Sequence, residues 1–148
     1  MGGNGVIISD MTWWMFALLS AISAAGTAIL AKVGVQGVPS NLATAIRTCV
    51  VLLFSWGIVF ATGDHRAMGT LKARSVVFLL LSGVGTGISW LAYFRALQLA
   101  PASRVAPIDK LSLAFTVALA ALVLGESISW KVAAGALLMV AGALLTLA

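Results

Sequence analysis

Charged residues are scarce in this sequence. Asp, Glu, Lys and Arg together make up 9% of its 148 residues, whereas 61% are hydrophobic, and the mean hydropathy is +1.11. A soluble globular protein needs far more polar surface than this to cover its core. The composition therefore excludes a soluble globule and predicts a protein that resides in a lipid bilayer.

Chemically reactive residues are just as scarce. Cys49 is the only cysteine and His65 the only histidine, so one chain can form neither a disulfide nor a metal site built from several Cys and His ligands. The same scarcity leaves no pair of nucleophile and base. Gly83, Gly85 and Gly87 do not make a nucleotide-binding loop, because they lie in an apolar stretch and no Gly-Lys-Ser or Gly-Lys-Thr follows them. We therefore expect a protein that is not an enzyme and holds no cofactor or metal.

Long apolar stretches fill most of the chain. About 20 helical residues at 1.5 Å each cross a hydrocarbon core of about 30 Å. Polar or helix-breaking residues, notably Pro39, Pro101 and Gly125, separate five such stretches. The sequence predicts an all-α integral membrane protein of one domain, with a short amino-terminal tail over residues 1–11 and transmembrane helices over about residues 12–34, 41–62, 75–99, 102–124 and 130–148.

Two of these helices carry a local signal. Pro107 should kink the fourth helix in its first turns, because proline cannot donate a backbone hydrogen bond and disfavours helix at the preceding residue. Ser129 is placed to cap the amino terminus of the fifth helix. The first ten residues contain no Lys or Arg, and no cleavable signal pattern follows them. We therefore expect the first helix to stay in the mature protein, in the plasma (inner) membrane.

The basic residues are divided almost equally between the two faces of the predicted membrane protein. They stand singly, so the net charge of +5 does not indicate a nucleic-acid partner. The face with the amino terminus carries four: Arg66, Lys72, Arg74 and Lys131. The opposite face carries five: Lys32, Arg47, Arg95, Arg104 and Lys110. Orientation follows the imbalance of Lys and Arg, so this near tie favours insertion in both orientations. A fixed orientation stays open if some of the five are buried functional charges.

Several charges lie inside the predicted helices. Arg47, Asp109 and Lys110 fall at a similar depth, about 5–10 Å below one interface. Charges within a span usually face a partner or a wet cavity. Asp109 has Arg47 and Lys110 as candidate partners. Lys32, Arg95 and Arg104 lie near helix ends, where the alternative is that they extend to the lipid headgroups.

Polar side chains also recur at helical spacing on three helices, so that each set occupies one helix face. Converging, these faces would line a polar pocket for a small solute. The alternative is that each hydroxyl bonds within its own helix. The predicted substrate-binding residues are Ser23, Thr27, Arg47, Trp90, Tyr93, Asp109, Lys110, Ser112 and Thr116. An excess of cationic groups would suit an acidic or zwitterionic solute, but Trp90 and Tyr93 would equally suit an organic cation.

A family resemblance rests on short motifs in the second half of the chain: Tyr93, Ala96 and Leu97; Pro101, Ala102 and Ser103; Leu124, Gly125 and Glu126; and Gly135 with Gly142. With them, the chain resembles the EamA branch of the drug/metabolite transporter superfamily from about Phe16 onward. Typical members have ten helices in two inverted five-helix repeats and move small metabolites or amino acids, usually outward. The resemblance implies that this chain is a single repeat and that Glu126 belongs to the turn signature. The chain departs from the pattern at residues 107–110, so substrate inferences do not carry over.

A single repeat of odd helix number can reproduce a ten-helix transporter only by pairing with an oppositely inserted copy. The resemblance thus favours a secondary active transporter, an antiparallel homodimer that exports small metabolites or amino-acid-like solutes by alternating access. Proton coupling through Asp109 is a further hypothesis. The alternative is a nontransporting small membrane subunit that packs with a different partner. An ion channel is less favoured, because no ring of acidic residues or filter-like loop is visible.

Overall fold

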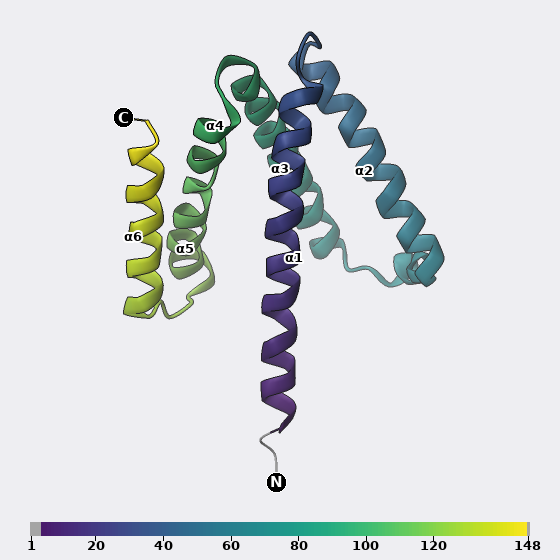
Figure 1. Cartoon of the computed structure of the whole chain (residues 1–148). Coiled ribbons are helices and arrows are strands. Elements are labelled where there is room, and N and C mark those ends of the chain that lie inside the picture. Colours follow the sequence, from purple (N-terminus) through teal and green to yellow (C-terminus); the bar gives the residue numbers. More distant parts are fainter. Residues whose placement is uncertain (1–3, 148) are drawn as a thin grey trace.

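A computed structural model describes residues 4–147 of the chain, and every regular element in that part is a helix (Figure 1). In chain order the elements are α1 (Asn4–Gly34), α2 (Ser40–Thr62), the 3-10 helix η1 (Asp64–Thr70), α3 (Ala73–Leu99), α4 (Ala102–Asp109), α5 (Leu111–Leu124) and α6 (Trp130–Leu145). Since α1 begins at Asn4, residues 4–11, which were expected to be part of a short tail, are helical.

The apolar helices match the predicted spans closely. Within the described residues, four helical stretches are long and apolar enough to cross a membrane: Trp13–Gly34, Ser40–Thr62, Ala73–Leu99 and Ala102–Leu124. The fifth, α6, is apolar but has only 16 residues. At 1.5 Å per residue it is about 24 Å long, somewhat short of the hydrocarbon thickness. The chain is therefore a multi-pass, all-helical membrane protein.

The fourth span is broken rather than continuous. Pro107 leaves the carbonyl of Ser103 without its usual helical donor. The Lys110 N–H then donates to both Ala106 O (3.2 Å) and Pro107 O (3.1 Å), and Lys110 O accepts from Leu113 N at 3.0 Å. This tightening ends α4 at Asp109 and starts α5 at Leu111. The kink expected from Pro107 thus takes the form of a break at Lys110, so the expected single helix over 102–124 is two helices.

Specific residues form the helix ends. Gly63 and Gly125 adopt left-handed conformations, with φ of 81° and 68°, at the carboxyl ends of α2 and α5. Glycine is favoured there because it has no Cβ to clash. Ser129 Oγ accepts a hydrogen bond from Val132 N at 3.3 Å, which confirms the cap expected for α6.

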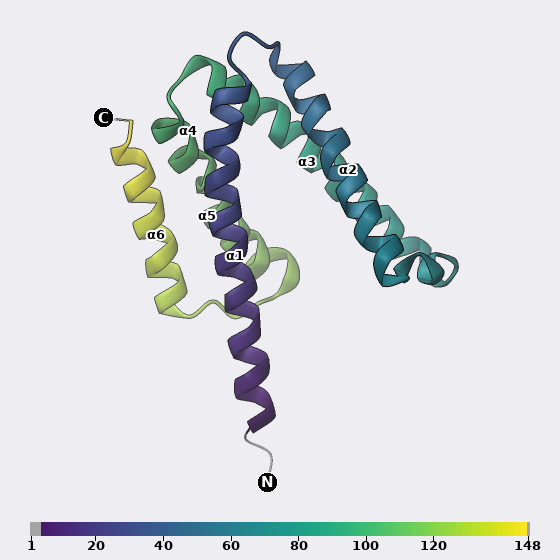
Figure 2. The same ribbon diagram turned by 45° about the vertical axis from the view of Figure 1, so that its right-hand side comes forward.

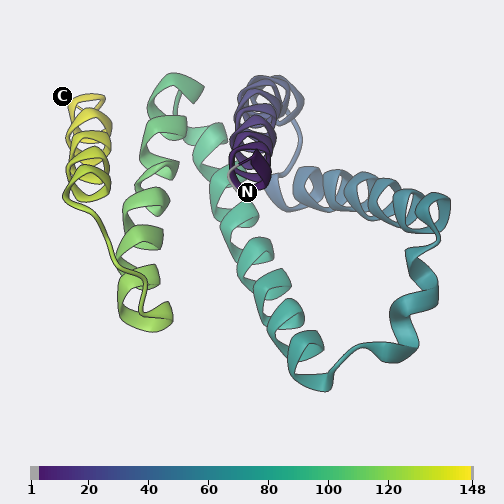
Figure 3. The ribbon, with the colours of Figure 1, turned by 90° about the horizontal axis from the view of Figure 1, so that it is seen from below.

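The helices come together at one end of the molecule and separate at the other (Figures 1 and 2). We call the region where α1 and α3 end and α2 and α4 begin the convergent end. The opposite region, with η1 and the turn over 125–129, is the open end. Viewed from the open end, α2 and α3 diverge from α5 and α6 (Figure 3). The main cluster of buried hydrophobic side chains lies at the convergent end and consists of Ala31, Val35, Phe94, Leu97 and Val105.

Two polar side chains tie the convergent end together. Lys32 Nζ donates to the carbonyls of Leu97 and Ala100, the latter at 2.9 Å. Gln98 Nε2 donates to Val38 O at 2.6 Å. Lys32 therefore binds carbonyls at the carboxyl end of α3, where a cation is favourable, instead of extending to the headgroups. These bonds hold the end of α3 against α1 and the α1–α2 loop, and so fix the helices that carry the polar residues.

Candidate functional site

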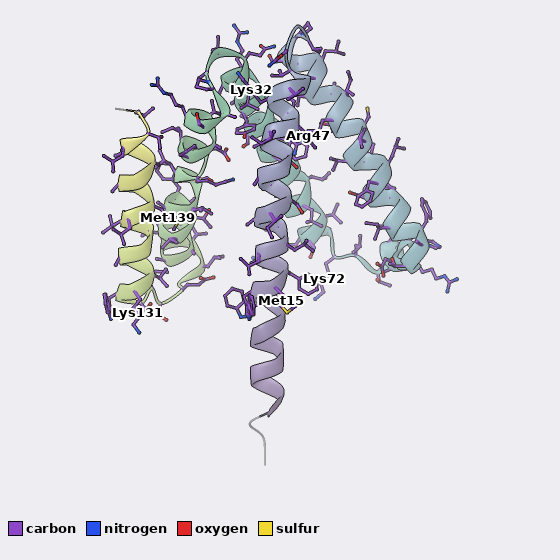
Figure 4. The ribbon with its side chains drawn as sticks, in the orientation of Figure 1. Met15, Lys32, Arg47, Lys72, Lys131 and Met139 are labelled. Carbon is purple, nitrogen blue, oxygen red and sulfur yellow. The ribbon has the colours of Figure 1, made fainter. Side chains whose placement is uncertain are left out.

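Arg47 lies on an aromatic platform inside the span. Its guanidinium carbon is 4.0 Å from the centre of the Trp90 ring and 5.6 Å from that of Phe94. Trp90 and Phe94 are four residues apart, so they project from the same face of α3. Packing between α2 and α3 brings the guanidinium over this face, where the negative aromatic face attracts the cation. Figure 4 shows Arg47 toward the convergent end, below Lys32.

Beside this platform is a cavity of about 200 Å³, which we call the chamber. It lies where α1, α2, α3 and the α4–α5 break meet. Its lining consists of Ala24, Thr27, Ala28, Arg47, Ser89, Trp90, Tyr93, Asp109 and Lys110. Six of the nine residues expected to bind substrate are in this lining, and they come from four different helical segments. The helices therefore bring together charges that are distant in sequence.

Asp109 pairs with its neighbour in sequence. Lys110 Nζ lies 3.1 Å from Asp109 Oδ2, and this is the one salt bridge found among the residues whose side chains are described, 13–147. Of the two candidate partners for Asp109, the structure thus selects Lys110. The pair balances its own charge, so that Arg47 supplies the net positive charge of the chamber.

Three of the expected residues lie outside the chamber lining: Ser23, Ser112 and Thr116. Thr116 Oγ1 donates to the carbonyl of Ser112 at 2.8 Å. This hydroxyl therefore bonds within its own helix, which was the alternative to a role in the pocket. Ser112 and Thr116 lie along α5, beyond the break that carries Lys110, whereas Ser23 lies in α1 next to the lining residue Ala24.

Sequence reasoning missed three residues of the lining: Ala24, Ala28 and Ser89. Ser89 lies four residues before Tyr93, so the same spacing rule could have found it. Ala24 and Ala28 are also four apart and contribute no polar group. Small side chains at this spacing leave room between helices, which is their contribution to the chamber.

Tyr93 lines the chamber and also two of the cavities next to it. One, of about 510 Å³, lies beside α3, α4 and the end of the chain, and its lining includes Ser89, Tyr93, Arg104, Asp109 and Leu147. The other, of about 520 Å³, follows α1 and reaches Pro107, Lys110 and Leu113. Ser89 and Asp109 also belong to the first of these cavities and Lys110 to the second, so the chamber adjoins both through several residues.

Comparison with known proteins gives a consistent result. Residues 11–148 match the EamA-like transporter family. A Sinorhizobium protein named as an uncharacterized transporter in the cobO 3′ region is 48% identical over 136 residues, which cover 92% of this chain and 96% of that protein. No solved structure matches the chain. The span of the family match and the likeness to a protein named as a transporter agree with the resemblance carried by residues 93–142, and the chain belongs to the EamA-like transporter family.

Proposed function

We propose that the chain is a secondary active transporter that exports small metabolites or amino-acid-like solutes from the cell, across the plasma (inner) membrane, by alternating access. The observation that carries this proposal is the chamber, which gathers Arg47, Asp109 and Lys110 inside a membrane-spanning bundle. Charged groups within a span are costly and usually mark a solute or ion pathway. The sequence holds no ATP-binding loop motif, so an ion gradient would drive the movement.

Within this proposal, the working unit is an antiparallel homodimer. The chain supplies five apolar helices, and its Lys and Arg are divided four to five between the two faces. Its similarity spans 96% of the Sinorhizobium relative, so that protein also has the length of one such unit. Two units inserted in opposite directions would give the inverted repeats from which many transporters are built. The open end of one copy would then lie beside the convergent end of the other.

Asp109 is the group we propose for proton coupling. As a carboxylate it pairs with Lys110 at 3.1 Å. On taking up a proton it loses its charge, and the pair with Lys110 loses its Coulomb attraction. Proton binding would thereby free the Lys110 side chain and change the charge of the chamber during the cycle. Transport by Asp109→Asn should no longer respond to an imposed pH gradient, whereas transport by the wild type should.

Reconstitution tests the transporter proposal directly. Purified protein in liposomes is assayed with a panel of radiolabelled amino acids and small organic acids, with and without a pH gradient. Arg47→Ala and Asp109→Asn should each reduce uptake about ten- to hundredfold, the range expected for losing a hydrogen bond to a charged group. Ser127→Ala, in the turn at the open end, is the control and should transport normally, because it leaves the number of Lys and Arg on each face unchanged.

Two outcomes would contradict these assignments. Wild-type rates in both chamber variants would show that the chamber is not the site. No flux of any solute from the isolated wild type, with only hetero-oligomers in native membranes, would favour the nontransporting subunit. Chromatography and helical content must be unchanged in each variant, so that a lost rate is not a lost fold.

Cysteine labelling tests the two orientations. Met68 lies in η1 at the open end and is 55% exposed. Met68→Cys in a Cys49→Ser background provides a single thiol. In intact cells, a membrane-impermeant maleimide should label about half of the protein, and the remainder should react only after the cells are opened. Labelling wholly from one side would overturn the antiparallel dimer.

A further inference from the structure

The aromatic face in the chamber is already occupied. Trp90 and Tyr93 could have bound an organic cation, but Arg47 lies 4.0 Å from the centre of the Trp90 ring. A guanidinium at this distance uses the negative face that a substrate cation would need. The second ring, Phe94, is 5.6 Å from the same guanidinium and is itself 4% exposed. Of the two rings that could have bound an organic cation, Trp90 is therefore already in contact with Arg47, which favours an anionic group on the solute.

Arg47 has no carboxylate partner among the side chains described, 13–147. The salt bridge in that part of the chain joins Asp109 to Lys110, while Asp64 Oδ2 accepts from the Thr62 hydroxyl at the open end. Arg47 lies seven residues after Ser40, the first residue of α2, which is about 10 Å along the helix at 1.5 Å per residue. A charge at this depth, without a carboxylate partner among the described side chains, favours binding a counter-charge that enters the cavity.

The guanidinium has the geometry to bind a carboxylate. Its planar fork of N–H donors can bind both oxygens of a carboxylate at once, whereas an ammonium acts as a point charge. The contact with Trp90, 4.0 Å from the guanidinium carbon to the ring centre, restricts where the fork can lie at the chamber. The Asp109–Lys110 pair balances itself, so the three charged groups of the chamber sum to one positive charge.

From these contacts we infer that the chamber selects solutes carrying a carboxylate, which Arg47 binds while stacked on Trp90, and discriminates against organic cations. This inference rests on the proposed transport function and names its substrate class. The chamber holds about 200 Å³, and Arg47 also lines a neighbouring cavity of about 360 Å³, so the carboxylate of the solute, rather than its size, is what this site recognises. Trp90 is a positioning residue, because it acts through the guanidinium.

Binding, measured apart from transport, tests the inference. The probes are straight-chain monocarboxylates of two to six carbons and the primary amines of the same chain lengths. Each is added to the purified protein in detergent without phospholipid, and its Kd is obtained from the rise in Tm, because a ligand that binds the folded state stabilises it. At least one acid should stabilise the wild type, and its matched amine should bind at least tenfold more weakly. Stabilisation by amines, or by none of the acids, would overturn the inference.

Variants separate the fork from its charge. Arg47→Gln should weaken binding of the acid about ten- to hundredfold. Arg47→Lys, which keeps the charge but loses the fork, should also weaken it. Trp90→Leu should weaken it about two- to thirtyfold and Trp90→Phe much less, because phenylalanine retains an aromatic face. Equal losses in Trp90→Leu and Trp90→Phe would contradict positioning by the ring. The matched control, Lys131→Gln, should bind as the wild type does.

A lipid phosphate is a second source of an oxyanion for Arg47. The protein is therefore also placed in nanodiscs of phosphatidylcholine alone or with phosphatidylglycerol. If only phosphatidylglycerol stabilises it, through Arg47, the ligand is a lipid and the inference of a carboxylate solute is wrong. Binding of acids without flux in liposomes would leave the carboxylate site intact and remove the transport proposal. Flux of amines and not of acids would support the transport proposal and overturn the inference of a carboxylate site.

Discussion

The convergent end and the open end contain similarly apolar helices, but apolar side chains are buried at the first and exposed at the second. Leu97, at the convergent end, is completely buried, and Val35 is 2% exposed. Near the open end, Leu122 is 82% exposed and Trp130 75%. The difference shows that hydrophobicity alone does not draw these helices together, as expected where lipid tails are as apolar as leucine.

Small residues and polar bonds account for the contrast. Ala31 is part of the buried cluster at the convergent end, and four further alanines pack against that cluster: Ala43, Ala96, Ala100 and Ala102. Small side chains allow helices to approach closely, and polar groups then bond across the contact. Lys32 and Gln98 supply such bonds only at the convergent end. Among the described side chains no comparable bond between helices is found at the open end, which leaves its apolar side chains to lipid or to a second copy of the chain.

The largest predicted difference between the ends comes from a buried leucine. Leu97→Ala should lower the free energy of unfolding by about 2–5 kcal/mol, because it leaves a cavity in the buried cluster. Leu122→Ala makes the same chemical change at an exposed position and should cost less than about 1 kcal/mol. Unfolding in mixed micelles, titrated with sodium dodecyl sulfate, measures both. Equal losses would show that the open end is as well packed as the convergent end.

The next effect is polar. Lys32→Met keeps an unbranched side chain but removes the donor to the carbonyls of Leu97 and Ala100. Losing hydrogen bonds from a charged group should cost about 1.5–3 kcal/mol. Hydrogen exchange should accelerate in the α1–α2 loop and at the end of α3. Lys131→Met, at the opposite end in Figure 4, is the control, and a comparable loss there would refute the special role of Lys32.

The smallest effect should lie at the open end. Ser129→Ala removes the cap of α6 and should cost about 1 kcal/mol. Ser127→Ala, in the same turn, should have almost no effect. Because the cap bonds only the first turn and α6 still packs against α5, the faster exchange should be confined to the first turn of α6. Exchange that also rose around Leu97 would show that the two ends are coupled.

Much of the fold follows from hydrophobic pattern and helix breakers. The apolar runs and the residues Pro39, Pro101 and Gly125 were sufficient to predict the spans to within a few residues at most boundaries. The position of the break at Lys110 could not be predicted. Pro107 removes one hydrogen bond, but the residue at which the following turns change their bonding depends on the packing of the helix. The end of the first helix at Gly34 was predicted, but the bonds from Lys32 to the carbonyls at the end of α3 were not.

The candidate site could be predicted only in part. Depth along the helices brought Arg47, Asp109 and Lys110 to one level, as the chamber has them. The stacking of Arg47 on Trp90 depends on how α2 is rotated against α3, which a single sequence does not contain. Spacing also could not separate Thr27, in the chamber lining, from Thr116, which bonds to its own helix.

The discontinuity at Lys110 has a mechanical consequence. α5 and α6 pack against each other and are joined by a short turn, whereas Lys110 is their covalent link to the rest of the chain. Rotation about the backbone of that single residue would move α5 and α6 together as a rigid body. α6 would then shift along α4, while Arg47, on α2, would stay in place. Since Leu147 follows α6 and lines the cavity beside Tyr93, such a rotation would change the width of that cavity.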